Sequence, residues 1–215
     1  MWVYSVPMKY LYPLVLVVLV LSLAWIIFAA SRSEGTIPRD NGGSAMANNA
    51  NHKTFTLSST AFSEGGTIPV TYTCDGDGAV HPPLSISNPP DGTKSFVLIM
   101  HDPDIPQQIK EERGIDEFDH WVVYGIPAGV REIPEGEGVG GAGLNGAEGE
   151  GYRGPCPPPD MEPTTHRYVF TLYALKGNLQ FIKAPTRAEV EAAMQGMVLD
   201  EAQLTGLYDR SVKTN

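Results

Sequence analysis

Histidine and aspartate side chains gather at the ends of apolar segments in this 215-residue sequence. His120 and His166 open the segments HWVVYGI and HRYVFTLYAL, and Asp102 and Asp104 follow the segment SFVLIM in the run HDPDIP. Imidazole and carboxyl groups bind anions, protons and metal ions. If these segments are antiparallel neighbours in a sheet, the start of one lies beside the end of the next. The spacing therefore predicts that His120, His166 and Asp102 converge on one site.

Some of these side chains have a structural alternative. An Asp-Pro-Asp run forms turns in which an aspartate accepts a hydrogen bond from the backbone two residues on, so we expect Asp102 or Asp104 to be structural. Arg167 lies in an apolar strand segment and needs a carboxylate partner. Asp104 is the candidate, which predicts a structural ion pair between Asp104 and Arg167.

Covalent and metal-dependent catalysis find little support in the motifs. There is no G-x-S-x-G sequence, and Cys156 lies between prolines with no helix start to lower its pKa. The histidines do not show the H-x-H, H-x-x-E-H or H-E-x-x-H spacing of common metal sites. We therefore expect no metal, no cofactor and no catalytic residue, although an enzyme that uses His120, His166 and Asp102 stays open as a third hypothesis.

Short segments rich in β-branched and aromatic residues predict a mainly β fold. The expected strands are residues 54–59, 67–74, 95–100, 120–126 and 167–175. Turns such as SEGG, CDGDG and NPPDG separate them, as is typical of a sandwich. Thr186 and Glu189 form a capping box that predicts one amphipathic helix, and alternation over 202–208 predicts a closing strand.

A long segment between Pro127 and Thr165 is rich in glycine and proline and has no sustained periodicity. Such a loop is either functional or disordered, because ordinary connections are about 4–6 residues long. Four prolines at 155 and 157–159 restrict its second half, which predicts a rigid wall. The only two cysteines are Cys74 and Cys156, and they are compatible either with one disulfide or with two thiols.

The N-terminal region has a different character from the rest of the chain. Residues 10–30 carry no charge and are about as long as a bilayer-spanning helix needs to be, roughly 20 residues. This predicts a membrane anchor or a cleaved signal peptide within residues 1–30, with the domain outside the cytoplasm in either case. Residues 31–53 are rich in Asn, Gly, Ser and Ala and predict a flexible linker before a domain at 54–215.

The net charge of −10 excludes several kinds of partner. The acidity belongs to the domain, because only Glu34 and Asp40 precede residue 54 among the acidic residues. A strongly acidic domain is a poor binder of nucleic acid or of anionic lipid surfaces. Any anion that it binds must be held by local hydrogen-bond donors.

Three separated motifs resemble those of the phosphatidylethanolamine-binding protein family, in its bacterial and archaeal Raf-kinase-inhibitor-like branch. They are DPDIP, HWVVYGIPAG, and GYRGPCPPPD with HRYVFTLYAL, and the resemblance extends over residues 55–210. It implies a β-sandwich with one or two short helices, here preceded by the N-terminal hydrophobic helix. It also implies a small anion pocket for phosphate or a phospholipid headgroup. The pocket positions of the family fall on Asp102, Pro106, His120, Gly154, Pro158, His166 and Tyr168.

The sequence departs from the family pattern in two places. The run DMEPTT separates the proline-rich wall from His166 and adds Asp160 and Glu162 to the rim of the expected pocket, where they would repel a large anion. The chain also ends soon after Tyr208, without the C-terminal helix of eukaryotic relatives. Kinase inhibition is therefore not carried over from the family.

Three hypotheses about function follow. The first is non-enzymatic binding of a small anion or phospholipid headgroup by a membrane-tethered or exported domain. The second is an interaction or inhibitor module that binds a protease or kinase through the loop at 127–165. The third is the metal-dependent or acid/base enzyme described above.

Overall fold

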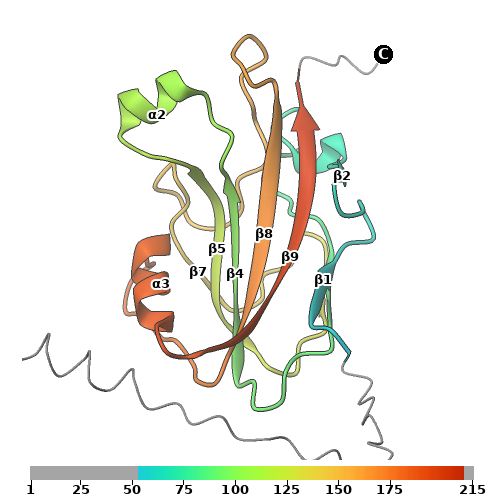
Figure 1. The fold of residues 1–215 in the computed structure, drawn as a ribbon, viewed down its shortest axis with the longest axis vertical. Coiled ribbons are helices and arrows are strands. Elements are labelled where there is room, and N and C mark those ends of the chain that lie inside the picture. Colours follow the sequence, from blue (N-terminus) through green and yellow to red (C-terminus); the bar gives the residue numbers. More distant parts are fainter. Residues whose placement is uncertain (1–52, 211–215) are drawn as a thin grey trace, which may run out of the picture. The chain divides into compact units, whose positions relative to one another are not determined.

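A computed structural model describes residues 53–210, which form two β-sheets, two α-helices and a short 3-10 helix (Figure 1). The larger sheet has six strands in the order β2-β9-β8-β4-β5-β7, and the smaller has three in the order β1-β3-β6. Strand bounds are β1 Thr56–Ser58, β2 Gly66–Thr67, β3 Leu84–Ser87, β4 Ser95–Asp102, β5 Phe118–Pro127, β6 Glu132–Ile133, β7 Gly141–Ala142, β8 Thr165–Leu175 and β9 Val198–Asp209. The predicted mainly β sandwich is confirmed.

The main core lies between the facing sides of the two sheets. Alternate residues of a strand point to opposite faces, so Phe96, Leu98 and Met100 of β4 share one face and are each 0% exposed. They belong to one cluster with Leu57 of β1 and Leu84 of β3. This packing fixes the central strands of the larger sheet, whose ends carry the polar residues discussed below.

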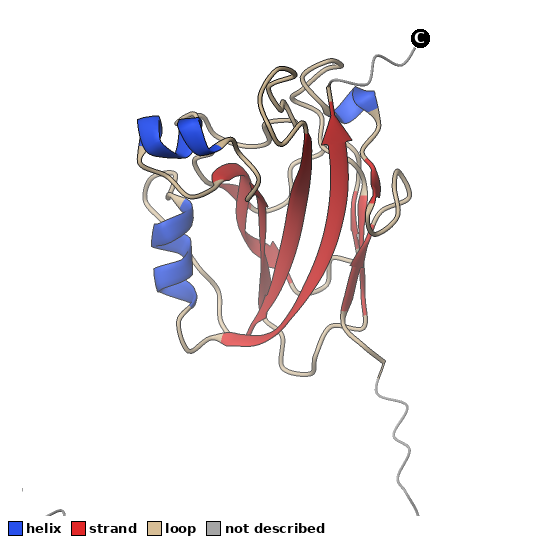
Figure 2. Ribbon diagram, turned by 45° about the horizontal axis from the view of Figure 1, so that its top comes forward, coloured by secondary structure: helices blue, strands red, loops and turns tan. Residues whose placement is uncertain are grey.

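A helix covers the other face of the larger sheet. Helix α3 (Arg187–Met194) packs Val190 and Met194 against Val97 and Ile99 of β4. Its start is the predicted capping box, in which Thr186 and Glu189 each accept a hydrogen bond from the backbone N–H of the other. In Figures 1 and 2 both α-helices lie on the side away from β1.

The strand expected at 67–74 is wrong. Only Gly66–Thr67 pairs with β9, in parallel, and a 3-10 helix η2 (Val70–Tyr72) follows. Pro69 has no backbone N–H for a sheet, and its carbonyl instead accepts a hydrogen bond from Tyr72 N at 3.0 Å. The β-branched and aromatic residues of this segment form a tight turn instead of a strand.

Several elements, among them a second α-helix and the central strand of the smaller sheet, lie outside the expected set of strands and helices. Helix α2 (Gln107–Arg113) buries none of its residues, so it shows no apolar periodicity, and it ends at Gly114 in the left-handed conformation with φ 65°. Strand β3 has only four residues, but it is the centre of the smaller sheet. Apolar periodicity does not indicate α2, because the helix lies on the surface, or β3, because the strand is too short.

The segment from 127 to 165 is irregular but extensively bonded. It contributes only the two-residue strands β6 and β7 and one isolated bridge, between Leu144 and Glu150. Gly154 and Cys156 belong to a stretch that is attached to the loop at 70–78, as described below. The proline-rich stretch is therefore ordered.

The predicted N-terminal helix within residues 1–30 and nearly all of the predicted linker at 31–53 lie outside the described residues. Within residues 53–210, no helix is long and apolar enough to cross a membrane.

Candidate functional site

Three strand ends bring the sequence-predicted polar residues together. Strand β4 lies between β5 and β8 and is antiparallel to both, so its end at Asp102 lies beside the starts that carry His120 and His166. All three side chains point inward and are nearly buried, with exposed fractions of 2%, 4% and 0%. Buried polar groups of this kind require hydrogen-bond partners, and those partners define what the site can do.

His166 makes two hydrogen bonds within the protein. Its Nδ1 lies 2.6 Å from Asp102 Oδ2, and its Nε2 lies 2.9 Å from the carbonyl oxygen of Pro163. A carbonyl oxygen can only accept, so Nε2 carries a hydrogen, and a second hydrogen lies between Nδ1 and the carboxylate. The pair of His166 and Asp102 is therefore neutral as a whole, and His166 has no free N–H for a ligand.

Asp102 also stabilises the turn that follows β4. Its Oδ1 accepts a hydrogen bond from Asp104 N at 2.8 Å, which is the expected Asp-Pro-Asp turn. Asp104 in turn makes a bidentate ion pair with Arg167, with distances of 2.8 Å to Nε and 2.7 Å to Nη2. The Arg167 hydrogen bonds hold the pKa of Asp104 below its usual value. Pro106 is buried and directly precedes α2.

His120 is held by one backbone segment. Its Nδ1 lies 2.7 Å from Arg153 O, and Arg153 N donates to His120 O at 2.9 Å. Because the Arg153 carbonyl only accepts, the hydrogen is on Nδ1, and no hydrogen bond from residues 53–210 reaches Nε2. Burial lowers the pKa of His120 to about 4, although the Arg153 carbonyl and Asp102 oppose this shift. The ring is neutral at pH 7.

Tyr168 has a buried hydroxyl whose polar neighbours are the backbone of Cys156 and the carboxylate of Asp102. Its side chain is 0% exposed, and Oη makes no hydrogen bond of ordinary geometry within the described part of the chain. Burial, followed by the charge of Asp102, raises the pKa of Tyr168, so the phenol is neutral. The ring lies 5.1 Å from that of His120 and 6.4 Å from that of His166, measured between centroids. An unpaired buried hydroxyl costs about 1–3 kcal/mol, which a ligand oxygen beside it would recover.

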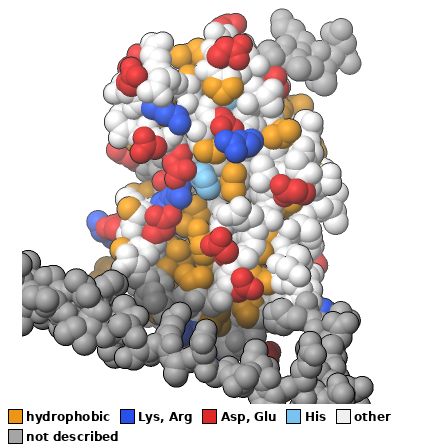
Figure 3. Space-filling view, in the orientation of Figure 1, with side chains coloured by type: hydrophobic (Ala, Val, Ile, Leu, Met, Phe, Trp, Pro, Cys, Tyr) orange, Lys and Arg blue, Asp and Glu red, His pale blue; other side chains and the backbone are white. Residues whose placement is uncertain are grey.

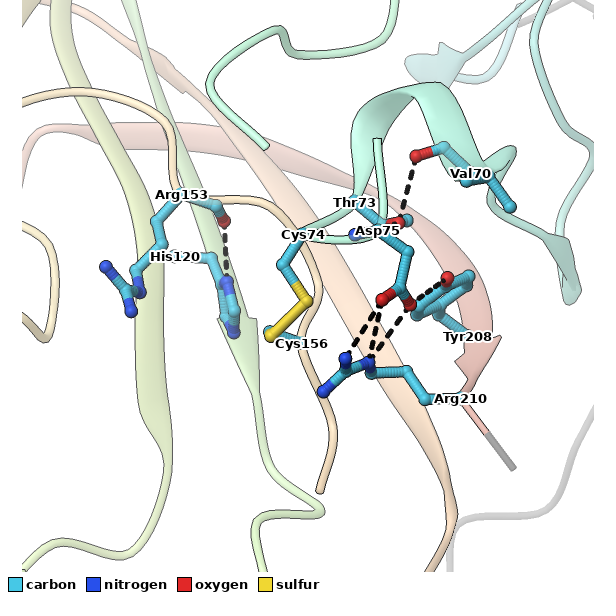
Figure 4. The surroundings of a disulfide bond; sticks show 9 residues. All are labelled: Val70, Thr73, Cys74, Asp75, His120, Arg153, Cys156, Tyr208 and Arg210. Carbon is cyan, nitrogen blue, oxygen red and sulfur yellow. Dashed lines mark hydrogen bonds and ion pairs between the residues drawn. A yellow bond between two sulfur atoms is a disulfide. The ribbon is translucent and has the colours of Figure 1, made fainter. Parts of the chain in front are cut away.

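The proline-rich stretch forms a wall beside His120. A disulfide joins Cys74 to Cys156 across 82 residues (Figure 4). Cys74 N also donates to Pro155 O at 3.0 Å. Gly154 N donates to Gly78 O at 2.8 Å, so this amide is also not free for a ligand. A Cβ at Gly154 would lie only 2.7 Å from Tyr72 O. Glycine is required there because two backbone segments pass so closely.

The rim insertion, residues 160–165, is attached to strand β9. Thr164 and Thr165 donate to Asp209 Oδ2 at 3.3 and 2.6 Å, which ties the insertion to the end of β9. Asp160 and Glu162 are exposed, and Pro158 is half-buried. The insertion contacts the site through the carbonyl oxygen of Pro163, which accepts a hydrogen bond from His166 Nε2.

The remaining histidines of the domain do not join this cluster. His101 points to the other face of the sheet, where its Nε2 lies 3.3 Å from Glu117, next to an Arg187 that pairs with Glu117, Asp119 and Glu191. Burial lowers the pKa of His101. His81 stacks on Trp121 with ring centroids 4.3 Å apart. No group of metal-ligating side chains occurs within residues 53–210.

Two hollows lie elsewhere on the domain. One of about 530 Å³ is lined mainly by residues 67–70 and 207–209, and one of about 550 Å³ by residues 57–59, 62–64 and 203–205. Neither lining includes His120, His166 or Tyr168. We place the candidate site at the buried cluster, because a buried hydroxyl without a well-formed hydrogen bond, that of Tyr168, indicates a ligand more directly than an apolar hollow does.

The sequence did not indicate the groups that fix the two imidazole rings. The acceptors are the backbone carbonyls of Arg153 and Pro163, and a carbonyl is present at every residue. Tyr152 was also missed, although its hydroxyl donates to Tyr72 O at 2.8 Å and so joins the wall to the η2 turn. Only its position directly before the proline-rich stretch could have drawn attention to it.

Fold and cluster together define a β-sandwich with a buried polar site at the ends of three antiparallel strands. The sequence profile of the phosphatidylethanolamine-binding protein family matches residues 58–209, and the chain belongs to this family. Its similarity to the bacterial and archaeal branch is confirmed by relatives described as UPF0098 proteins. That of Aquifex aeolicus is 41% identical over 160 residues (71% of this chain and 86% of the relative), and that of Methanothermobacter thermautotrophicus is 41% identical over 164 residues (72% and 98%).

Solved structures of relatives have the same fold. A homologue of phosphatidylethanolamine-binding protein from Chlamydia trachomatis is 39% identical, with a TM-score of 0.66 over 73% of this chain and 97% of its own. E. coli YbcL, described as a member of the mammalian family, is 27% identical, with a TM-score of 0.62 over 72% and 98%.

Proposed function

We propose that the chain is a non-enzymatic binding protein for a small phosphate-type anion, either free or as a phospholipid headgroup. The observation that carries this proposal is the buried hydroxyl of Tyr168, which makes no hydrogen bond of ordinary geometry within residues 53–210 and belongs to a ring 5.1 Å from that of His120, measured between centroids. A ligand oxygen beside this hydroxyl could accept its hydrogen bond. Tyr168 and His120 also fall on pocket positions that the family resemblance implies.

The surface of the domain supports capture by local groups. Figure 3 shows acidic side chains scattered over the face seen in Figure 1, in keeping with the net charge of −10. Such a surface does not concentrate anions. Affinity must therefore come from hydrogen bonds inside the site, where low polarity strengthens them.

Phosphate titration of the purified full-length chain in a non-ionic detergent tests this proposal. Isothermal calorimetry should detect one site in the wild type, and Tyr168→Phe should weaken it roughly 10- to 100-fold, the effect of losing one hydrogen bond to a charged group. Tyr173→Phe is the matched control, since Tyr173 is on the same strand but points to the other face. Equal affinity in Tyr168→Phe and wild type would contradict the assignment.

The proposal includes a membrane-tethered or exported domain. The hydrophobic run at 10–30 motivates it, together with the disulfide, because disulfides persist mainly in oxidising compartments.

A further inference from the structure

Charges of opposite sign gather at opposite ends of the larger sheet. At one end β4 begins where β5 and β8 finish, since Ser95 pairs with both Pro127 and Leu175, and β9 begins beside them. We call this the basic end (bottom of Figure 1) and define it as residues 53–54, 88–94, 128–131, 176–178 and 195–200. It carries a net charge of +2, from four cations less two carboxylates, namely Lys53, Lys94, Arg131, Lys176, Asp91 and Asp200.

The opposite end, which holds the candidate site, is strongly acidic. The loops at 70–78, 103–117 and 143–164 together contain eleven Asp or Glu and three Lys or Arg. Residues 53–210 have a net charge of −12, from 11 basic and 23 acidic residues, so the part outside the basic end sums to −14. The expectation that this domain avoids anionic lipid surfaces rests on its total charge, and the structure separates that charge between two ends.

Backbone contacts hold the cations of the basic end close to one another. Lys94 N donates to Leu175 O at 2.7 Å, and Lys176 N donates to Met197 O at 2.9 Å. Within residues 53–210 none of the four cations makes an ion pair with a carboxylate. Their charges are therefore available to an external partner.

Two large apolar side chains are exposed among these cations. Val198 is 43% exposed and Leu199 is 40% exposed. A Cβ at Gly92 would lie 4.0 Å from Leu199 Cδ1, so Leu199 lies against the turn at 88–94. A surface that combines Lys or Arg with exposed apolar side chains is typical of proteins that rest on phospholipid headgroups.

We propose that the basic end docks on an anionic lipid surface while the chain is held at the membrane by its N-terminal hydrophobic run. This rests on the membrane-tethered form of the function proposed above, because stable attachment to lipid takes two signals. The described part of the chain begins in the basic end, where Thr54 O accepts a hydrogen bond from Asn88 Nδ2 at 3.1 Å. The chain therefore enters the domain on the face that meets the lipid.

Screening decides between attraction at the basic end and repulsion from the rest of the domain. The eight residues of β4 place the two ends about 25 Å apart, at roughly 3.2–3.4 Å per residue. The Debye length is about 8 Å at physiological salt, so the acidic loops of the far end lie about three Debye lengths from the lipid. A net charge of +2 should favour the docked orientation about thirtyfold, at roughly fivefold per charge. The candidate site then faces the aqueous phase.

A second copy of the chain is a poorer partner for this surface. Two basic ends placed face to face would bring like charges together, which disfavours association. An anionic bilayer supplies both negative charge and an apolar layer for Val198 and Leu199.

Lysine reactivity on nanodiscs tests the docking. The full-length chain is reconstituted into nanodiscs of phosphatidylcholine alone, or of an equal mixture with phosphatidylglycerol, and is modified briefly with a water-soluble acylating reagent. Mass spectrometry should show that Lys53, Lys94 and Lys176 react at least about threefold more slowly on the anionic discs. Lys110 is the internal control, because it lies on α2 beyond the other end of β4, and its rate should be unchanged. High salt should remove the difference, since the Debye length falls to about 3 Å at 1 M.

Charge reversal identifies the residues responsible. In the double variant Lys94→Glu, Lys176→Glu, with its fold checked by thermal unfolding, Lys53 should react equally fast on the two kinds of disc. Lys110→Glu is the matched control, and it should retain the slower reaction of Lys53 on anionic discs. A double variant that also retained this slower reaction would contradict the assignment of the basic end.

Three outcomes would overturn the inference. Equal reactivity of Lys94 and Lys176 on both kinds of disc would refute docking, while co-elution of the chain with the discs would still support tethering. A chain that elutes apart from both kinds of disc would refute tethering, and docking with it. Equal protection of these lysines in non-ionic detergent and on anionic discs would indicate contact with an acidic protein or a second copy instead of lipid. Phosphate titration reports the anion site independently of all three.

Discussion

At the scale of single residues, the charge of His120 depends strongly on folding. Burial lowers its pKa from 6.5 to about 4, so between these values the unfolded chain binds a proton that the folded chain does not. Stability therefore rises with pH across this window and is lost as pH falls from 6.5 towards 4. His101 contributes in the same direction, since burial also lowers its pKa.

This gives a prediction for stability. The free energy of unfolding should fall by about 3 kcal/mol between pH 7 and pH 4 through His120 alone, at 1.36 kcal/mol per pKa unit. Urea unfolding of wild type and His120→Gln at both pH values isolates the contribution, because His101 and the carboxylates titrate in both proteins. The difference in free energy of unfolding between wild type and His120→Gln should be about 3 kcal/mol smaller at pH 4 than at pH 7. If it stays constant from pH 7 to pH 4, the ring is not held neutral by the fold.

At the scale of elements, the site depends on the attachment of the wall to the loop at 70–78. The disulfide, the hydrogen bond from Cys74 to Pro155 and the contact of Gly154 with Gly78 make this attachment. The same wall supplies the Arg153 carbonyl that selects the His120 tautomer. Loosening the wall should therefore affect both stability and binding.

The double variant Cys74→Ser, Cys156→Ser tests that dependence. Removing a native disulfide costs about 2–5 kcal/mol, because the unfolded chain gains freedom, so thermal unfolding should shift to markedly lower temperature. Phosphate affinity should also fall under conditions in which the variant is fully folded. Thr186→Ala is the control, since it weakens the α3 cap, away from the site, by about 1 kcal/mol. If both variants kept wild-type affinity, the wall would have no part in binding.

The sequence predicted much of this arrangement. Short runs of β-branched and aromatic residues identified β4, β5 and β8, and alternation identified β9. The antiparallel placement of β4 between β5 and β8 explains why Asp102, His120 and His166 meet. Turns that use proline and β-branched residues, such as η2, are misread because their composition is that of a strand. The roles of the two imidazoles could not be predicted, because they depend on hydrogen bonds to backbone carbonyls. A backbone carbonyl is present at every residue, so the residue types do not indicate which one will serve.

At the scale of the whole molecule, a hydrophobic N-terminal run is joined to a strongly acidic domain. Both cysteines of the domain are exposed and bonded to each other, which suits an oxidising environment. This supports the proposed location of the domain outside the cytoplasm.

The location predicts the redox state of the cysteines in intact cells. After rapid acid quenching and denaturation, a maleimide of high mass should label neither cysteine unless the sample is first reduced, when it should label both. A Cys74→Ser variant, which has one free thiol, is the positive control. Labelling of both cysteines without reduction would mean that the domain resides in a reducing compartment. Retention of the chain in membranes after alkaline extraction would distinguish an anchored from a cleaved N-terminus.

The rim insertion touches His166 through the carbonyl of Pro163, while Asp160 and Glu162 extend into solvent. A main-chain contact places little demand on the neighbouring side chains. The insertion can therefore accumulate substitutions at Asp160 and Glu162 without disturbing the buried proton network beneath it. This makes the segment a suitable place for a protein engineer to graft a randomised loop above an unchanged site.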